Sequence, residues 1–408
     1  MIGKAIRKYH DLLQEGNTAQ HTHDLLYNDL KKRELFFGDV PVCRVLRPQF
    51  YINEDWIYLK SQTELILQAF KKAHIATIES GDLRAQLSLD PYEEDLFVLD
   101  TGLTAPWSSS RLDAFYKPED RYLRFVEYNA ETPAGIGYGD ELAEAFLNLP
   151  IMKKFQESYA VNYSTGQDQL LDMIIRAYRE WGGTVPNPQI AIVDWQDVPT
   201  LREHRITANY FTKHDYKCIL ADPHNLEYHD GHLWHDNFRI DLIYKRVLYS
   251  ELIERMGLES PLIMAMKDRA VFMTNSPSAK LMSKKASLAM LSDEQNMHLF
   301  TTEELNAIEL HIPWTRRVAD RETYYRGQLI DLLPYLRDYR ENFVIKPNDD
   351  YGGRGVVIGW QTTEEEWEDA LQEGLTFPYV VQEKVTLVER DFPMMIDGQL
   401  DISPRFID

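Results

Sequence analysis

One stretch of the sequence, residues 343–359, places a lysine and a glycine-rich turn between two apolar runs. The first run, residues 343–345, leads directly to Lys346. The turn that follows contains Gly352, Gly353, Arg354 and Gly355. Residues 356–358 are again apolar and β-branched, which is typical of a strand. The stretch therefore predicts a β-hairpin with a cation at the end of its first strand and a loop of small residues.

Such a hairpin is suited to a phosphate ligand. Glycine lets a ligand approach main-chain N–H groups closely, and a lysine provides a point charge for a phosphate oxygen. Two common phosphate loops are excluded, because no G-x-x-x-x-G-K-[ST] string occurs and the dinucleotide fingerprint needs a helix after its glycines. An ordinary β-hairpin with a glycine turn is the alternative that the stretch alone leaves open.

The composition limits the class of protein. A chain of 408 residues indicates two or three subdomains. Its 44% hydrophobic and 12% aromatic residues are typical of a globular protein with a large core. The formal net charge of −21 argues against a general nucleic-acid or anionic-membrane surface. It does not exclude a local basic pocket for a phosphorylated ligand.

The cysteines and the apolar stretches indicate a location. Cys43 and Cys218 are the only cysteines, and they give neither a disulfide framework nor a zinc pattern. A reducing cytoplasm is therefore expected. The N-terminus lacks the apolar core of a signal peptide, and no apolar stretch approaches the roughly 18 residues of a membrane span. We expect neither a membrane nor a nucleic-acid partner, and the oligomeric state stays open.

The hydrophobic pattern divides the chain into four regions. Helical spacing of apolar residues within 1–37 and over 60–80 indicates an N-terminal helical region at 1–95. Residues 96–185 follow, with strands predicted at 96–99 and 122–128. Short strands alternate with a helix over 186–262, which indicates an α/β layer. Residues 263–408 contain the glycine hairpin.

Two smaller predictions concern local structure. A helix is predicted over 325–340. His21 and His23 flank a threonine in a polar stretch that reads as a solvated turn. A metal site at these histidines is the alternative.

Two strings upstream carry the residue types that magnesium needs. Glu127 and Asn129 end a predicted strand, where alternation puts them on one face about 7 Å apart. Arg111 and Asp113 have the same spacing. Mg²⁺ prefers oxygen ligands, so Asp113, Glu127 and Asn129 are candidate ligands of one or two ions, with Arg111 beside a transferring phosphoryl group. The alternative is the polar side of a half-buried strand, although the glycine-punctuated loop 131–139 favours a ligand site.

Gln382 and Glu383 lie where a predicted strand over 379–385 runs into a hinge. Backbone N–H and C=O groups at such a hinge suit the edge of an adenine, and Glu383 is a candidate acceptor for the base or the ribose. An ordinary strand that ends in charged residues is the alternative.

These strings together resemble the circularly permuted ATP-grasp family, whose best-known relative is glutathionylspermidine synthase. The matching strings are Arg111-x-Asp113, Glu127-x-Asn129-x-x-Thr132-Pro133, Lys285, the hairpin Val344–Gly355, and Gln382-Glu383. The Glu-x-Asn string precedes the glycine loop by more than 200 residues, whereas an ordinary ATP-grasp chain has the glycine loop first. The resemblance covers roughly residues 100–408.

The resemblance implies a fold. It implies an α/β (α+β) fold, a circularly permuted ATP-grasp with a preATP-grasp-like α/β subdomain at 186–262 and an N-terminal helical region. The metal-binding part of the core would lie at 96–185 and the nucleotide-binding part at 263–408. Because residues 401–408 read as the middle of a strand, a closing segment beyond residue 408 is one expectation.

The resemblance also implies ATP and Mg²⁺ as ligands and a role for each matching residue. Asp113, Glu127 and Asn129 match the magnesium ligands, and Arg111 matches an arginine near the γ-phosphate. The residues that match the nucleotide site are Lys285, Lys346, Gly352, Gly353, Arg354, Gly355, Gln382 and Glu383. Lys280 and Lys284 are alternatives to Lys285. Arg354 stands where many relatives carry lysine and keeps the positive charge.

The activity expected from the resemblance is an ADP-forming carbon–nitrogen ligase. A small-molecule or peptide carboxylate would be phosphorylated by ATP, and an amine would then displace phosphate to form an amide. The alternatives are a phosphotransferase on the same scaffold and a nucleotide-binding scaffold protein without catalysis. The sequence does not identify the acid or the amine.

Overall fold

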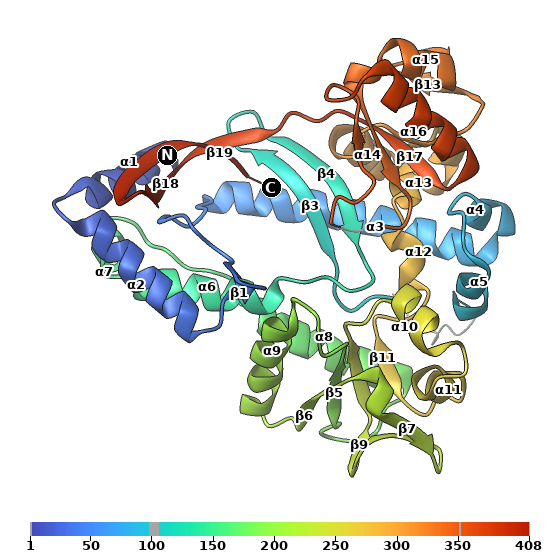
Figure 1. The fold of residues 1–408 in the computed structure, drawn as a ribbon, viewed down its shortest axis with the longest axis horizontal. Coiled ribbons are helices and arrows are strands. Elements are labelled where there is room, and N and C mark those ends of the chain that lie inside the picture. Colours follow the sequence, from blue (N-terminus) through green and yellow to red (C-terminus); the bar gives the residue numbers. More distant parts are fainter. Residues whose placement is uncertain (1, 98–105, 351, 408) are drawn as a thin grey trace.

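The structure, a computed structural model, describes residues 2–97, 106–350 and 352–407. Figure 1 shows the N-terminal helices and the C-terminal hairpin at one end of the molecule and the sheet that carries the glycine loop at the other. The long helix α3 (Asn53–Glu79) runs between these two ends, and an α/β layer lies below it in the view.

The N-terminal helices α1 (Ile2–Gln14) and α2 (Thr18–Lys32) confirm the helical prediction for this region. His21 and His23 lie inside α2, so the predicted turn is wrong. The buried side of α2 runs through Ala19, Thr22, Leu26 and Leu30, and the buried threonine continues the helical stripe across a stretch that looks polar.

Short elements complete the segment up to residue 97. Its elements are β1 (Phe36–Phe37), β2 (Val40–Pro41), α4 (Gly81–Ala85) and α5 (Pro91–Phe97). Leu96 and Phe97 therefore end a helix, and the predicted strand is wrong for these two residues. Proline at the first helical position and Glu93 and Glu94 in the first turn favour this helix. The rest of that predicted strand, 98–99, lies outside the described residues.

Two long strands form an antiparallel hairpin, β3 (Arg111–Lys117) and β4 (Tyr122–Asn129). The prediction of a strand at 122–128 is confirmed. Helices α6 (Ile136–Asn148), α7 (Pro150–Gln156) and α8 (Gly166–Trp181) follow. The hairpin packs on α3 through a core that includes Phe70, Phe125 and Tyr128, which fixes β4 on the face of the long helix.

A parallel sheet forms the centre of the α/β layer, in the order β11-β10-β5-β6. Its strands are β5 (Ile190–Val193), β6 (Cys218–Ala221), β10 (Leu242–Lys245) and β11 (Phe272–Thr274). Alternate residues enter two cores: Ile190 and Ile192 pack on the side of α8, whereas Ala191 and Val193 pack on the opposite side. Burial of both faces explains the continuous apolar runs in the sequence.

The other elements of this layer cover or extend the sheet. They are α9 (Leu201–Lys213), η1 (Pro223–Asn225), β7 (Leu226–His229), β8 (His232–His235), β9 (Phe238–Ile240), α10 (Tyr249–Met256) and α11 (Pro261–Lys267). Asp230 and Gly231 join β7 to β8, and both residues have positive φ, as a tight hairpin turn requires.

A second sheet carries the glycine hairpin, in the order β12-β17-β15-β16 with antiparallel pairing throughout. Its strands are β12 (Thr315–Arg317), β15 (Phe343–Pro347), β16 (Val357–Ile358) and β17 (Tyr379–Glu383). Val344 pairs with Ile358 and Ile345 with Val357. The strand–loop–strand prediction for this stretch is confirmed.

Helices and a small hairpin surround the second sheet. They are α12 (Ala279–Ser283), α13 (Ala286–Ser292), η2 (Glu294–Leu299), α14 (Thr302–His311), β13 (Glu322–Tyr325), β14 (Gln328–Asp331), α15 (Leu332–Asp338), η3 (Arg340–Asn342) and α16 (Glu364–Thr376). The predicted helix over 325–340 is wrong before residue 332. Arg326 and Gly327 both have positive φ and turn β13 into β14.

The last hairpin, β18 (Val388–Ile396) and β19 (Gln399–Ile407), returns to the N-terminal helices. Arg47 is buried beneath it, donates to the carbonyl of Asp391 and lies over the ring of Phe392. These contacts attach the end of the described chain to its beginning. Among the helices of the described residues, none has the length and apolar character that crossing a bilayer requires.

Candidate functional site

Strand pairing brings four of the predicted site residues onto one face of the β3–β4 hairpin. Arg111 is opposite Asn129, and Asp113 is opposite Glu127. Residues two apart on a strand share a face, and so do residues directly across the ladder. A register shift follows Asp113, so the four residues form the regular, open end of the hairpin.

Asp113 is the centre of the contacts among these four residues. Arg111 donates from Nε and Nη2 to the two carboxylate oxygens of Asp113, at 2.6 and 3.0 Å. Asn129 donates to Oδ2 of Asp113 at 3.3 Å. The hydrogen bond from Arg111 to Asp113 raises the pKa of Arg111. The arginine therefore keeps its charge, and a second donation from Arg111 holds the carbonyl of Ala134 at the start of the following loop.

Lys285 joins this face from the helical segment after α12. Its Nζ lies 3.2 Å from Oε1 of Glu127 and also donates to the carbonyl of Asp350, just before the glycine loop. The main-chain N–H of Lys285 donates to the carbonyl of Asn348. One lysine thus touches the β4 carboxylate and the segment that leads into the loop.

Lys346 approaches β4 from the other side, at the end of β15. Its Nζ donates to Oε1 of Gln382 at 2.7 Å and lies 3.4 Å from the carbonyl of Val126, next to Glu127. Burial lowers the pKa of Lys346; Glu127 partly opposes this and Lys285 adds to it, and the resulting pKa is about 8. Within the described residues Lys346 makes no ion pair with a carboxylate at 4 Å or less, so its charge is only partly compensated.

Lys280 and Lys284, the sequence alternatives to Lys285, lie in a separate buried network. Lys280 contacts Glu131 at 3.1 Å and Asp349 at 2.6 Å. Lys284 contacts Glu93 at 2.9 Å and Asp349 at 3.2 Å. Each amine is already flanked by two carboxylates, whereas Lys285 faces Glu127. The geometry therefore favours Lys285 as the lysine next to a ligand.

The glycine loop has the backbone that its composition predicts. Gly352, Gly353 and Gly355 have φ of +66°, +74° and +66°, a region that side chains with a Cβ rarely adopt. At Gly355 a Cβ would also come within 2.7 Å of Pro347. The described loop residues, including Arg354, are exposed. Tyr351 lies outside the described residues.

The side chains at the predicted hinge already have hydrogen-bond partners within the protein. Gln382 is buried between Lys346 and the hydroxyl of Thr315. The carboxylate of Glu383 accepts hydrogen bonds from Tyr325 and Arg326 and not from Lys285 or Lys346.

The main-chain donors at the hinge are also used. The N–H groups of Glu383 and Lys384 donate to the carbonyls of Trp314 and Asn342. In the described part of the chain, Val385 has no hydrogen-bond partner for its N–H. The free main-chain donor at the hinge is thus that of Val385 and not that of Glu383.

Seven predicted residues form one connected group along β4: Arg111, Asp113, Glu127, Asn129, Lys285, Lys346 and Gln382. The carboxylate of Glu383 contacts Tyr325 and Arg326 instead, and among the described residues the three loop glycines have no contact of this kind with the group. A set of three or more His, Cys, Asp or Glu side chains able to hold a metal does not occur among the described residues. The side-chain oxygen donors of the group are the carboxylates of Asp113 and Glu127 and the amides of Asn129 and Gln382, the last of which already accepts from Lys346.

Sequence reasoning missed Asn275, which follows β11 and is 3% exposed. Its side chain hydrogen-bonds the main chain on both sides of the open end of the β3–β4 hairpin. The only local signal is a polar residue after an apolar run, which many strand ends share.

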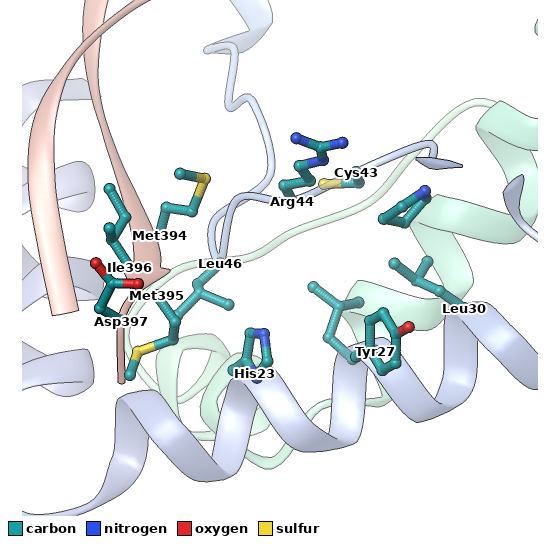
Figure 2. Close-up of a pocket in the computed structure, with 12 residues that line it drawn as sticks. His23, Tyr27, Leu30, Cys43, Arg44, Leu46, Met394, Met395, Ile396 and Asp397 are labelled. Atoms are coloured by element: carbon teal, nitrogen blue, oxygen red, sulfur yellow. The ribbon is translucent and has the colours of Figure 1, made fainter. Parts of the chain in front are cut away.

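A hollow of about 450 Å³ lies elsewhere, between α2 and the turn of the β18–β19 hairpin. Figure 2 shows His23 and Tyr27 on the helix and Met394, Met395 and Asp397 on the hairpin. Most of the lining is apolar, and none of the predicted site residues belongs to it.

Comparison with known proteins gives a fold and no sequence relative. No family model matches the sequence, and no curated protein matches it. In fold, the chain is similar to a glutathione synthetase-like effector. That structure, from Globodera pallida in its apo form, has a TM-score of 0.63 and 12% sequence identity, over 97% of this chain and 87% of that one.

A D-alanyl-alanine synthetase A from Vibrio cholerae O1 biovar eltor also matches, with a TM-score of 0.28 and 13% identity over 54% of this chain and 67% of that one. This likeness is too weak to bear on the fold. The structure is a mixed α/β fold similar to that of the glutathione synthetase-like effector.

Proposed function

We propose that the protein is an ATP-dependent carboxylate–amine ligase, which forms an amide or peptide bond through an acyl phosphate. The observation that carries this proposal is the connected group along β4. It combines two carboxylates, two amides and three cations, contributed by segments that are far apart in the sequence. A phosphoryl-transfer site needs this mixture of oxygen donors and positive charges.

The residues present fit magnesium. Mg²⁺ is usually held by one or two carboxylates together with water and substrate phosphates, and Asp113 and Glu127 with the carbonyl of the Asn129 amide are donors of this kind. We propose these three as its ligands. When bound, the ion would neutralise charge on the phosphates of ATP.

The chain's own residues then have distinct tasks. Lys285 and Lys346 would hold nucleotide phosphates, and Gly352, Gly353 and Gly355 would close over them. An oxygen of the substrate carboxylate attacks the γ-phosphorus, and the bond to ADP breaks. Arg111 would stabilise the charge on the transferring group.

In the second step the amine nitrogen attacks the acyl carbon. The bond to phosphate breaks, and the amine loses a proton. Neither step needs a covalent bond to the enzyme. The contribution of the protein is therefore positioning and charge.

The proposal includes a circularly permuted ATP-grasp arrangement, because the metal-type strands precede the glycine hairpin in the chain. It keeps the four-part division at residues 95, 185 and 262. It includes Gln382 and Glu383 at the adenine end of the site, with the free N–H of Val385 beside them. A cytoplasmic location belongs to it as well, since Cys43 and Cys218 are both free thiols.

The test measures magnesium-dependent ADP release with a panel of amino acids and polyamines. Glu127→Gln and Lys346→Met should each lower the rate by about 100-fold or more, the usual cost of removing a group that stabilises the transition state. The matched controls are Glu227→Gln and Lys267→Met on the α/β layer, which should keep the wild-type rate. Full activity in both site variants contradicts the assignment.

The product distinguishes the ligase from its alternatives. An amide together with ADP and phosphate supports a ligase. A stable phosphorylated product indicates a phosphotransferase. Nucleotide binding without turnover of any substrate indicates a scaffold protein.

A further inference from the structure

A side chain from the α/β layer bridges the open end of the β3–β4 hairpin. Asn275 follows β11 and is 3% exposed. Its Oδ1 accepts from the N–H groups of Ser108 and Ser109 at 2.8 and 3.3 Å. Its Nδ2 donates to the carbonyl of Ser109 at 2.8 Å and, across the hairpin, to those of Ala130 and Glu131 at 2.7 and 3.2 Å.

These partners are the main-chain segments next to the site. Ser109 comes two residues before Arg111, and Ala130 directly follows Asn129. Arg111 and Asn129 are the last pair of the hairpin ladder. The amide of Asn275 is thus the bridge that continues the pairing where the ladder ends.

We propose that Asn275 is a positioning residue of the site: it sets the separation of the two strand ends and thereby the contact of Arg111 and Asn129 with Asp113. This inference rests on the proposed function and adds a residue that touches neither nucleotide nor metal. Asn275 contacts neither Lys285 nor Lys346, so its effect is confined to the metal-type side.

Asn275→Asp tests this with almost no change in shape. The aspartate keeps the acceptor for Ser108 and Ser109 but places an oxygen against three carbonyls, where a donor is required. The strand ends should separate, and a misplacement of about 1 Å costs about 100-fold in rate. We expect kcat to fall by about that factor and the magnesium concentration for half-maximal rate to rise about tenfold. The affinity for ADP without magnesium should stay within about twofold, since the lysines are untouched.

Asn296→Asp is the matched control. Asn296 is 1% exposed and donates to Gln86 and to the carbonyl of Met290, away from the β3–β4 hairpin. Asn296→Asp should lower the free energy of unfolding. The protein that stays folded should keep the wild-type dependence of the rate on magnesium concentration. A proportional loss of kcat and ADP binding in Asn275→Asp, as in a partly unfolded protein, overturns the proposal. If Asn275→Asp does not fold, Asn275→Ala removes the bridge without the repulsion. The same comparison of kcat with the affinity for ADP then applies to that variant.

Hydrogen exchange provides a readout that does not depend on activity. In the Asn275 variant, exchange should accelerate in residues 108–113 and 127–131 while β15 and β17 keep their protection. Unchanged exchange at both strand ends overturns the positioning role. If exchange changes as expected but the wild type shows no magnesium-dependent turnover, the proposed function fails and the structural bridge remains.

Discussion

The described part of the molecule contains two lysine clusters of opposite character, and Lys284 and Lys285 place them next to each other in the sequence. Lys280 and Lys284 each lie between two carboxylates. Lys285 and Lys346 share the single carboxylate of Glu127, to which only Lys285 is close. The first cluster is saturated with opposite charge, whereas the second has positive charge to spare.

The pKa shifts follow this difference. Burial alone would lower the pKa of Lys280, but Glu131 and Asp349 hold it above its ordinary value. Lys280 and Lys284 lower the pKa of Asp349 to about 2, although burial alone would raise it. At Lys346 burial dominates and the pKa falls to about 8. A cation that the fold leaves undercompensated is stabilised by an anionic ligand, whereas a saturated one stabilises the fold itself.

The two lysine clusters should differ most in their effect on the free energy of unfolding. Lys280→Met takes the nearer lysine from the buried carboxylate of Glu131, which keeps Lys245 at 3.6 Å, and one of two lysines from Asp349. This should lower the free energy of unfolding by about 3 kcal/mol. Lys346→Met removes a buried charge that has little compensation, so the same free energy should stay unchanged or rise. Chemical denaturation of both variants measures this. Equal destabilisation by the two substitutions would show that the clusters do not differ.

This contrast also shows how much of the site could be predicted from the sequence. The glycine hairpin is a local pattern, and its apolar runs and glycines were enough to predict β15 and β16 with a turn between them. The choice between Lys280, Lys284 and Lys285 was left open. It depends on Glu93, Glu131 and Asp349, which lie up to about 190 residues away in the chain and which no periodicity connects to them.

The same reason explains the predictions that were wrong or missing. Leu96 and Phe97 have strand-like side chains, but Pro91 and two glutamates begin a helix that includes them. The helix predicted over 325–340 overlooked Gly327 as a hairpin turn. Asn275 has no local signal, since its five main-chain contacts come from two segments that only the tertiary fold brings together.

The second largest effect is a pH dependence of nucleotide affinity. We expect it from the cluster of Lys285 and Lys346 and not from that of Lys280 and Lys284. Lys346 loses its proton as the pH rises through about 8, and the neutral amine no longer attracts a phosphate. Nucleotide affinity should be constant below about pH 7 and fall by up to about tenfold per pH unit above pH 8. Titration calorimetry between pH 6.5 and about 9.5 measures the affinity.

Stability should change in the opposite direction. Because the folded pKa lies below the ordinary 10.5, the unfolded chain binds this proton more tightly. The free energy of unfolding that Lys346 contributes therefore rises between about pH 8 and about pH 10.5. Lys346→Met should abolish both trends. A pH dependence of affinity that persists in this variant would assign it to another group.

The smallest effect concerns Arg354, the exposed cation of the glycine loop. Charges in contact with water contribute about 0.2–1 kcal/mol and are screened by salt, so Arg354→Ala should weaken nucleotide binding only about two- to fivefold. Arg354→Lys should bind as the wild type does. Raising the salt concentration should shrink the effect of Arg354→Ala while that of Lys346→Met persists, because the amine of Lys346 is held against β4 and Gln382. Equal salt sensitivity of the two variants would mean that Lys346 meets the phosphates in open solvent, and the distinction between a buried and an exposed cation at this loop would be lost.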